Sequence, residues 1–442
     1  MSPFNIAVIG TGIAGLSAAW LLSQKHNVTI YEQENRIGGH SNTVTVNGSL
    51  GPIAVDTGFI VYNESSYPNL TALFQHLDVP TKASDMSFAA SLDAGRLEYS
   101  GTDLNGLFGQ RRNLLRRRFW TMLKDLRRFY RDAPQLLNET RHSCVTLEEY
   151  LAANGYSSAF IDYHLLPMGA AIWSASARAM LAFPAVAFIR FFVSHGLLQV
   201  SGRPVWRTVD GGSREYIKRL TCSFEKDIHT SCEATMVARK SGKVLVGSQK
   251  EGIREFDQVV IATHADQALR LLNAPEPQER NLLGAISYST NRTLLHRDAR
   301  LMPKRRRVWS SWNYIQSRGV GSVAPLCVTY WMNKLQGIPD TDPLFVTLNP
   351  AIEPEERLLL HEYKYEHPQF DSDAMAAQDG LWPLQGVGGI WFCGSYFGYG
   401  FHEDALQSGL AVAEALGGVR RPWSVEKESS RITPSAPFPY AA

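Results

Sequence analysis

The chain has 442 residues, of which 44% are hydrophobic and 19% are charged, and its formal net charge is +2. Because a single hydrophobic core stops growing at about 250–300 residues, this length favours two domains. The ordinary globular composition excludes extensive disorder, and the small net charge gives no support for nucleic-acid binding.

The five cysteines are scattered without a CxxC pair, so we expect reduced thiols and no metal site. Residues 180–198 are the most apolar later stretch, but Pro184, Arg190 and His195 interrupt it before it reaches the roughly 20 residues of a spanning helix. No secretory signal precedes the first predicted strand. We therefore expect a cytoplasmic protein without a transmembrane segment.

Residues 5–9 predict a buried parallel strand, and the motif GTGIAG at residues 10–15 follows it and opens an apolar helix. Gly10 permits a tight turn, Gly12 lets the backbone approach a pyrophosphate, and Gly15 lets the helix pack closely on the strand. The helix start offers free N–H groups to phosphate oxygens. The predicted cofactor contacts are Gly10, Gly12, Ile13, Ala14 and Gly15.

A second strand is predicted at residues 28–31 and ends in Glu32, about 20 residues after the glycine turn, where a carboxylate accepts hydrogen bonds from an adenosine ribose. A second glycine pair follows, with two cation-capable neighbours. A simple nicotinamide dehydrogenase has no need of this pair, so the pattern favours FAD over NAD. The predicted contacts here are Glu32, Gln33, Arg36, Gly38, Gly39 and His40.

The combination of GxGxxGL, a strand-end Glu and RxGGR resembles the flavin-containing amine oxidase superfamily. This chain departs from the pattern at His40, where the family has arginine. Two interpretations of His40 remain: it donates a hydrogen bond near the phosphates or the ribityl chain, or it attaches covalently to the flavin.

Later segments extend the resemblance. The Asp-x-Gly at residues 56–58 matches a segment that passes close to the flavin in the superfamily. The strand at residues 256–263 and the pair at 236–237 match two further cofactor strands, and residues 389–409 match the final FAD motif. The resemblance therefore implies cofactor contacts from Thr57, Gly58, Phe59, Ile60, Val237, Thr263, Gly394, Phe401 and His402.

We accordingly predict an α/β fold with a Rossmann-like FAD-binding domain of the amine oxidase/glutathione reductase type and a discontinuous α+β substrate domain. The FAD-binding domain comprises residues 1–84, 212–277 and 380–420, and the substrate domain comprises residues 85–211 and 278–379. Residues 421–442 form a C-terminal tail. The sequence gives no signal for an oligomeric state.

The insertions resemble a narrower branch of the superfamily, the predicted NAD/FAD-binding oxidoreductases related to those encoded near cyclopropane-fatty-acyl-phospholipid synthases. The matching stretches span nearly the whole chain and include DTGFIVYNESSYPNL, LLPMGAAIWS, PVWRTVDGGSREY and GFHEDALQSGL. This resemblance implies action on fatty-acyl chains, including their dehydrogenation.

Residues 111–131 carry eight arginines, and their apolar residues recur at helical spacing. Two interpretations remain for this basic amphipathic helix. It makes a peripheral contact with an anionic membrane, or it is a solvated surface helix packed on its own domain. The apolar positions are Leu115, Phe119, Met122, Leu126 and Phe129.

The predicted reaction is oxidation or desaturation of a small lipophilic, acyl-type substrate by hydride transfer to N5 of FAD. Three alternatives remain open: an amine oxidase, a flavin-dependent isomerase or cyclase, and a non-catalytic lipid-binding escort protein of the same fold. The candidate groups that assist loss of the second hydrogen are Tyr396, His402, Tyr330, Asn333 and His195.

Overall fold

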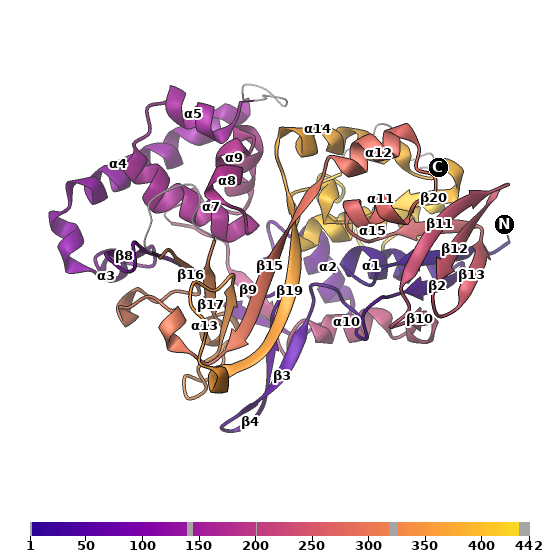
Figure 1. The fold of residues 1–442 in the computed structure, drawn as a ribbon, viewed down its shortest axis with the longest axis horizontal. Coiled ribbons are helices and arrows are strands. Elements are labelled where there is room, and N and C mark those ends of the chain that lie inside the picture. The colour runs from indigo at the N-terminus through magenta and orange to yellow at the C-terminus, as the bar shows by residue number, and fades with distance from the viewer. Residues whose placement is uncertain (1, 139–144, 200, 318–325, 433–442) are drawn as a thin grey trace.

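The computed structural model describes residues 2–138, 145–199, 201–317 and 326–432 of the chain. One part of the molecule contains the helices α1 (Ile13–Leu22) and α15 (His402–Leu416), which come from the two ends of the chain (Figure 1). The other part is a cluster of helices around α4 (Arg117–Asp132). Two long strands, β15 (Ser287–His296) and β19 (Leu359–Gln369), run between the two parts.

A five-stranded parallel sheet forms the centre of the first part, in the order β10-β2-β1-β14-β20. Parallel strands that are covered on both faces are strongly apolar, and Ile6, Val8 and Val260 are accordingly fully buried. The strands come from the beginning, middle and end of the chain: β1 (Asn5–Ile9), β2 (Asn27–Tyr31), β10 (Ile228–His229), β14 (Gln258–Ile261) and β20 (Ile390–Phe392).

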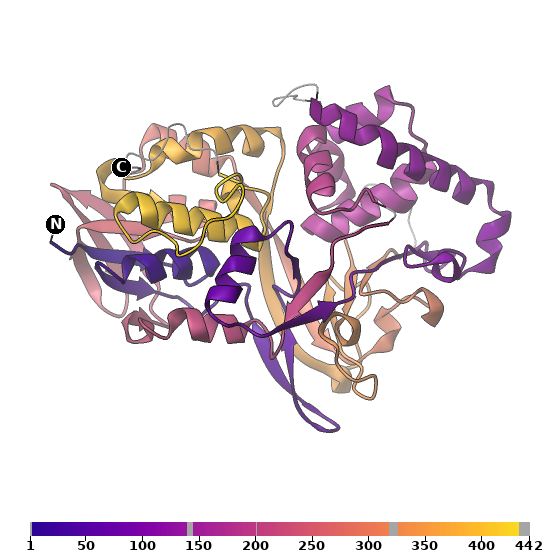
Figure 2. The same cartoon turned by 180° about the vertical axis from the view of Figure 1, so that it is seen from behind.

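Helices α1 and α15 pack against each other beside this sheet, as the reverse view also shows (Figure 2). Gly409 of α15 permits the contact, because a Cβ there would lie 2.2 Å from the carbonyl oxygen of Ala14 in α1. A glycine inside a helix costs roughly 1 kcal/mol relative to alanine, so this close approach explains its presence. The contact holds the first turns of both helices beside one cavity.

An antiparallel sheet of three strands precedes β14 in the chain: β11 (Ala234–Lys240), β12 (Lys243–Ser248) and β13 (Gly252–Phe256). Helix α10 (Arg214–Thr221) precedes these three strands in the chain. Three helices follow them: α11 (Ala265–Leu271), α12 (Pro277–Gly284) and α14 (Ser372–Leu381).

A seven-stranded sheet, in the order β19-β15-β18-β17-β16-β7-β8, joins the two parts. All of its pairs are antiparallel except that of β16 with β7. Its remaining strands are β18 (Phe345–Leu348), β17 (Val328–Trp331), β16 (Trp312–Ile315), β7 (Phe88–Leu92) and β8 (Leu97–Ser100).

The helical cluster packs around the fully buried rings of Phe119, Phe160 and Phe188. The helix expected over residues 111–131 is divided, because Arg116 is extended between a 3-10 turn at Arg111–Leu115 and α4. Phe119, Met122 and Phe129 of α4 are buried, so its apolar face packs inside the protein. The other members are α3 (Leu104–Leu107), α5 (Leu147–Ala153), α7 (Leu166–Trp173), α8 (Ala177–Ala182) and α9 (Ala185–Ser194).

The expected α/β class, with a Rossmann-like parallel sheet and a discontinuous α+β part, is confirmed. The proposed domain boundaries stay a prediction. At the boundary after residue 211, strand β9 (Trp206–Val209) pairs with β5 (Tyr62–Asn63) and β6 (Thr81–Ser84), so pairing groups β9 with residues 1–84.

The remaining elements are the hairpin of β3 (Thr43–Gly48) and β4 (Gly51–Asp56), and the helices α2 (Pro68–His76) and α13 (Met332–Gln336).

Among the described residues, no helix has the length and apolar character needed to cross a bilayer. Within the proposed tail, residues 421–432 are described and residues 433–442 lie outside the described ones. The buried Arg421 pairs with Glu414 of α15, which holds the start of the tail against that helix.

Candidate active site

One cavity of about 1020 Å³ passes through the centre of the molecule, and its volume lies at the upper end of the range of ligand pockets. Segments from the beginning, middle and end of the chain line it. The residues predicted as cofactor contacts that line it are Gly10, Gly12, Ile13, Ala14, Glu32, Gln33, Arg36, Gly38, Gly39, His40, Thr57, Gly58, Phe59, Ile60, Thr263, Gly394, Phe401 and His402. Their contact with a cofactor stays a prediction.

The glycines of the first turn differ in what surrounds them. A Cβ on Gly15 would lie 2.0 Å from the Gly10 carbonyl oxygen, and one on Gly10 would lie 2.8 Å from the Ala262 carbonyl oxygen. At Gly12, by contrast, no heavy atom of the described residues lies within 4 Å of the Cβ position. Gly10 and Gly15 therefore serve packing, whereas Gly12 leaves open space at the uncapped start of α1.

The second glycine pair lies directly against the first turn. A Cβ on Gly39 would be 3.2 Å from the Cα of Gly12, and the Gly38 N–H donates to the Thr11 carbonyl oxygen at 3.1 Å. The Glu32 carboxylate accepts hydrogen bonds from the Thr11 N–H at 3.0 Å and the Glu34 N–H at 2.9 Å. These bonds fix the carboxylate at the cavity wall, as expected for a ribose-binding residue.

His40 is placed by the turn at residues 57–59. The Phe59 N–H donates to the His40 carbonyl oxygen at 2.8 Å, and a Cβ on Gly58 would lie 2.2 Å from that oxygen. The Nε2 atom of His40 is buried without a hydrogen-bond partner among the described residues. Burial and the neighbouring histidines His367 and His264 hold the pKa of His40 well below its usual value, so the ring is neutral.

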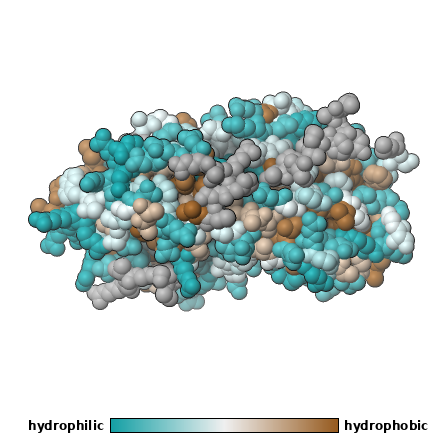
Figure 3. Space-filling view, turned by 90° about the horizontal axis from the view of Figure 1, so that it is seen from above, coloured by the Kyte–Doolittle hydropathy of each residue, from teal (hydrophilic) through white to brown (hydrophobic). Residues whose placement is uncertain are grey.

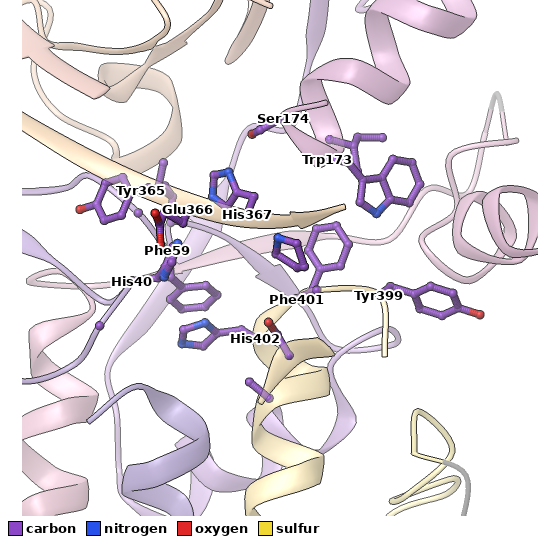
Figure 4. Close-up of a pocket in the computed structure, with 18 of the residues that line it drawn as sticks. His40, Phe59, Trp173, Ser174, Tyr365, Glu366, His367, Tyr399, Phe401 and His402 are labelled. Atoms are coloured by element: carbon purple, nitrogen blue, oxygen red, sulfur yellow. The ribbon is translucent and has the colours of Figure 1, made fainter. Parts of the chain in front are cut away.

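His402 begins α15 and stacks on Phe59, with ring centroids 3.8 Å apart (Figure 4). Its Nε2 lies 2.8 Å from the Tyr216 hydroxyl and 3.1 Å from the Ser41 hydroxyl. Burial lowers the pKa of His402 to about 3, so it is a neutral hydrogen-bonding group. The contact joins the end of the chain to the loop that carries His40.

Two buried carboxylates position the start of α15. Glu403 accepts hydrogen bonds from the N–H groups of Asn69 at 3.1 Å and Leu70 at 3.0 Å. Asp404 accepts the Phe401 N–H at 2.8 Å and pairs with Arg431 at 3.2 Å. Burial raises the pKa of both carboxyls. The sequence analysis did not assign them a role, although two adjacent acids at a helix start are a visible signal.

Three of the remaining catalytic candidates, Tyr396, His195 and Tyr330, line the cavity. The Tyr396 hydroxyl is buried and has no hydrogen-bond partner among the described residues. Nδ1 of His195 lies 3.0 Å from the Phe191 carbonyl oxygen, and its ring stacks on Phe191 with centroids 3.8 Å apart. Burial lowers the pKa of His195 to about 3.

Neither Asn333 nor Val237 lines the cavity, and the roles assigned to them stay predictions. The Asn333 amide donates to the carbonyl oxygens of Pro339 and Asp342, both at 2.8 Å, and thus holds the loop after α13. Val237 is a buried residue of β11, and the cavity reaches residues 233–235 at the start of that strand. Gly15 also lies outside the lining, and it serves helix packing as expected.

Strand β19 brings Tyr365 and His367 into the site, which sequence reasoning missed (Figure 4). The Tyr365 hydroxyl lies 2.7 Å from the Thr57 hydroxyl and accepts the Asn42 amide N–H at 2.9 Å. The His40 ring centroid is 5.0 Å from that of Tyr365 and 5.4 Å from that of His367. The alternation of aromatic and charged residues along HEYKYEH could have indicated this strand face.

Beyond these residues the cavity continues into an apolar arm inside the helical part. Its wall is formed by side chains of α3, α4, α7 and the loop after α9: Leu107, Met122, Leu123, Leu126, Tyr130, Met168, Ile172 and Leu197. Arg203 is exposed where it lines this end, and its side chain donates to the Gln199 carbonyl oxygen at 2.7 Å. The arm suits a long apolar molecule, and the glycine-lined end suits an anionic dinucleotide.

The family model for flavin containing amine oxidoreductases matches residues 13–340. A 4,4'-diapophytoene desaturase (4,4'-diaponeurosporene-forming) from Staphylococcus aureus is 46% identical over 55 residues, which are 12% of this chain and 11% of that protein. The chain therefore matches about a tenth of the length of these curated relatives.

Solved structures of the same fold match far more of the chain. A CLA-producing fatty acid isomerase from P. acnes aligns with a TM-score of 0.63 at 16% identity, over 93% of this chain and 97% of that one. Cyclohexylamine oxidase from Brevibacterium oxydans IH-35A aligns with a TM-score of 0.65 at 16% identity, over 94% and 99%. At these identities the likeness shows the fold.

Proposed function

Since the chain belongs to the flavin-containing amine oxidoreductase family and is an FAD-dependent oxidoreductase, we propose that it oxidises or desaturates a lipophilic, acyl-type small molecule. When bound, FAD supplies the acceptor for a hydride equivalent from a C–H bond held against its ring. The residues around Gly12, Glu32 and Gly39 would hold the adenosine diphosphate, and those around His40, Phe59 and His402 would lie on the ring side.

The observation that carries this proposal is the apolar arm on the same cavity. Met122, Leu126, Met168 and Ile172 offer a substrate only hydrocarbon and thioether contacts, which position a chain and exclude water. Arg203 is the one Lys, Arg, Asp or Glu side chain at this end among the described lining residues, and its charge suits a carboxylate or phosphate head.

The same charge distribution gives less support to an amine as substrate. The carboxylates that line the cavity belong to Glu32, Glu34, Glu233 and Glu366, all of them outside the apolar arm. A cationic amine in the arm would meet Arg203 and no acid.

Tyr396, His195 and His402 act in this proposal as hydrogen-bonding groups that orient the substrate or cofactor. A general base works best with a pKa near the working pH, and burial lowers the pKa of both histidines to about 3. Burial raises the pKa of Tyr396, so its phenol stays protonated and can donate a hydrogen bond.

We place the enzyme in the cytoplasm, in peripheral contact with a membrane through the segment at residues 111–131.

Anaerobic reduction of the bound flavin tests the proposal directly. Purified holoenzyme is mixed with saturated and unsaturated fatty acids, phospholipids or amines, and bleaching of the oxidised flavin band is followed together with the product. Bleaching by acyl compounds and not by amines is the expected result. Bleaching by amines alone, or an enzyme without FAD, refutes the proposal, and a rearranged product without net oxidation identifies an isomerase.

A further inference from the structure

A protruding segment at residues 104–120, here called the tip, carries apolar and cationic side chains together. Four of the eleven exposed large hydrophobic residues in the described chain lie within it. They are Leu104, Leu114, Leu115 and Trp120, with exposed fractions of 74%, 46%, 88% and 49%. Monomeric proteins rarely leave such a group of large apolar side chains in water without a partner.

The tip is held together by its own contacts. The Trp120 indole N–H donates to the Leu114 carbonyl oxygen at 2.9 Å, and its ring lies 5.6 Å from that of Phe108. Arg111 donates to the Asn105 side chain at 2.8 Å and to the Phe108 carbonyl oxygen at 3.0 Å. The apolar groups are therefore displayed on a built surface.

The charge of the tip is strongly positive. It contains five arginines and no acid. Asp103 directly precedes it, and its carboxylate accepts the Gly106 N–H at 2.6 Å. No ion pair is recorded for Arg112 or Arg117 within the described chain, and Arg116 donates to the neutral Asn113 side chain. Arg118 interacts electrostatically with Asp162 and donates a hydrogen bond to the Ser158 hydroxyl at 3.2 Å. These charges are thus available to an anionic partner.

We propose that the tip docks on the surface of an anionic phospholipid bilayer, with Leu104, Leu115 and Trp120 inserted at the interface and the arginines on lipid phosphates. Protein segments that bind at a membrane interface combine leucine and tryptophan with neighbouring arginines. A soluble polyanion would satisfy the arginines and leave the leucines in water. The apolar face of α4 takes no part, because it packs inside the protein.

The position of the tip connects this surface with the substrate cavity. Leu107 of α3 lines the apolar arm, three residues after the exposed Leu104. Met122 and Leu123 line the same arm just beyond Trp120. An acyl chain leaving the bilayer at the tip would therefore reach the arm alongside α3 and α4. This step rests on the proposed oxidation of an acyl substrate, whereas the docking itself does not.

Seen from above, the end of the molecule that carries α4 has a mostly hydrophilic surface with a few hydrophobic residues in it (Figure 3). This mixed surface distinguishes docking at the interface from insertion into the hydrocarbon core. Binding should therefore depend on both charge and apolar contact, and it should weaken as salt screens the charges.

Co-sedimentation of the FAD-loaded full chain tests the docking. Vesicles of phosphatidylcholine alone are compared with vesicles containing roughly a third phosphatidylglycerol. The wild type should bind only the anionic vesicles, and Arg112→Glu/Arg117→Glu and Leu104→Ser/Leu115→Ser should each bind about tenfold more weakly. Lys226→Glu/Arg280→Glu makes the same change of charge at exposed positions outside the tip and should bind like the wild type.

The flavin spectrum and the melting temperature establish that each variant is folded. Absence of wild-type binding to anionic vesicles, undiminished binding of both tip variants, or an equal loss in the control variant would overturn the inference. Because flavin reduction by dispersed acyl compounds needs no vesicle, failure of docking with intact flavin reduction removes the membrane contact and leaves the proposed oxidation of an acyl substrate standing.

Discussion

The substitution Gly12→Ala separates cofactor binding from folding. Gly12 has a φ of −63° that any residue adopts, and no heavy atom of the described residues lies within 4 Å of its Cβ position. Alanine is slightly worse than glycine at a helix N-cap, but it also lowers the entropy of the unfolded chain, so the apoprotein should stay within about 1 kcal/mol of wild type. The new methyl group instead occupies space that we assign to the pyrophosphate.

Displacing the pyrophosphate by a methyl group costs at least one charge-assisted hydrogen bond of ~1.5–3 kcal/mol, which corresponds to about 10- to 150-fold weaker FAD binding. Titration of apoprotein with FAD, followed by flavin fluorescence, measures this change, and denaturation of the apoprotein measures the stability. Gly15→Ala is the matched control, because its Cβ would lie 2.0 Å from the Gly10 carbonyl oxygen and should destabilise the fold by roughly 1–3 kcal/mol. Wild-type FAD affinity in Gly12→Ala would refute the reasoning.

Three further predictions concern acid, attachment of the flavin and the substrate. Burial lowers the pKa of His195 and His402 to about 3 from an unfolded value near 6.5, so below pH 6.5 the unfolded chain takes up protons that the folded chain does not. The free energy of unfolding should therefore fall as pH decreases, by roughly 1.4 kcal/mol per pH unit for each histidine. Denaturant titrations at pH 7 and pH 5 should show a smaller loss of this free energy in His195→Gln than in the wild type. An equal loss in the two proteins contradicts the prediction. The buried Nε2 of His40 has no hydrogen-bond partner among the described residues, and we assign it a hydrogen bond to the cofactor. Acid precipitation should therefore release FAD into the supernatant, and flavin retained on the pellet would show covalent attachment. Arg203→Glu should weaken binding of a fatty acid about fivefold and leave binding of its methyl ester unchanged. Perturbation of the flavin spectrum measures both affinities. Equal effects on acid and ester would show that Arg203 does not recognise the carboxylate.

The elements at the glycine-lined end of the cavity could be predicted because local signals and tertiary packing agree there. The strand expected at residues 5–9 is β1, and the turn and helix after it follow the expected order. The C-terminal motif expected at residues 389–409 contains β20 and the first half of α15. In each case glycine, apolar runs and helix periodicity indicate the same structure, so little depended on distant contacts.

The substrate end could not be predicted with the same precision, because its residues are brought together by pairing between distant segments. Asn333 has an amide that could serve in a site, yet this amide donates to three carbonyl groups of the loop after α13. His367 reaches the cavity only because β19 pairs with β15 over its whole length. Val237 lies in the middle of β11, whereas the cavity meets that strand at its first residues.

Helices α1 and α15 share a property that explains why the two ends of the chain must meet. Neither helix has a side-chain cap at its N-terminus, where Gly12 and Phe401 stand in place of the usual serine, threonine or acid. The recorded hydrogen bonds of Glu403 and Asp404 go to α2, to the loop before α15, to Gln407 and to Arg431. Both first turns line the same cavity, so two positive helix ends converge on one space, where we expect an anionic cofactor to supply the acceptors that the side chains do not.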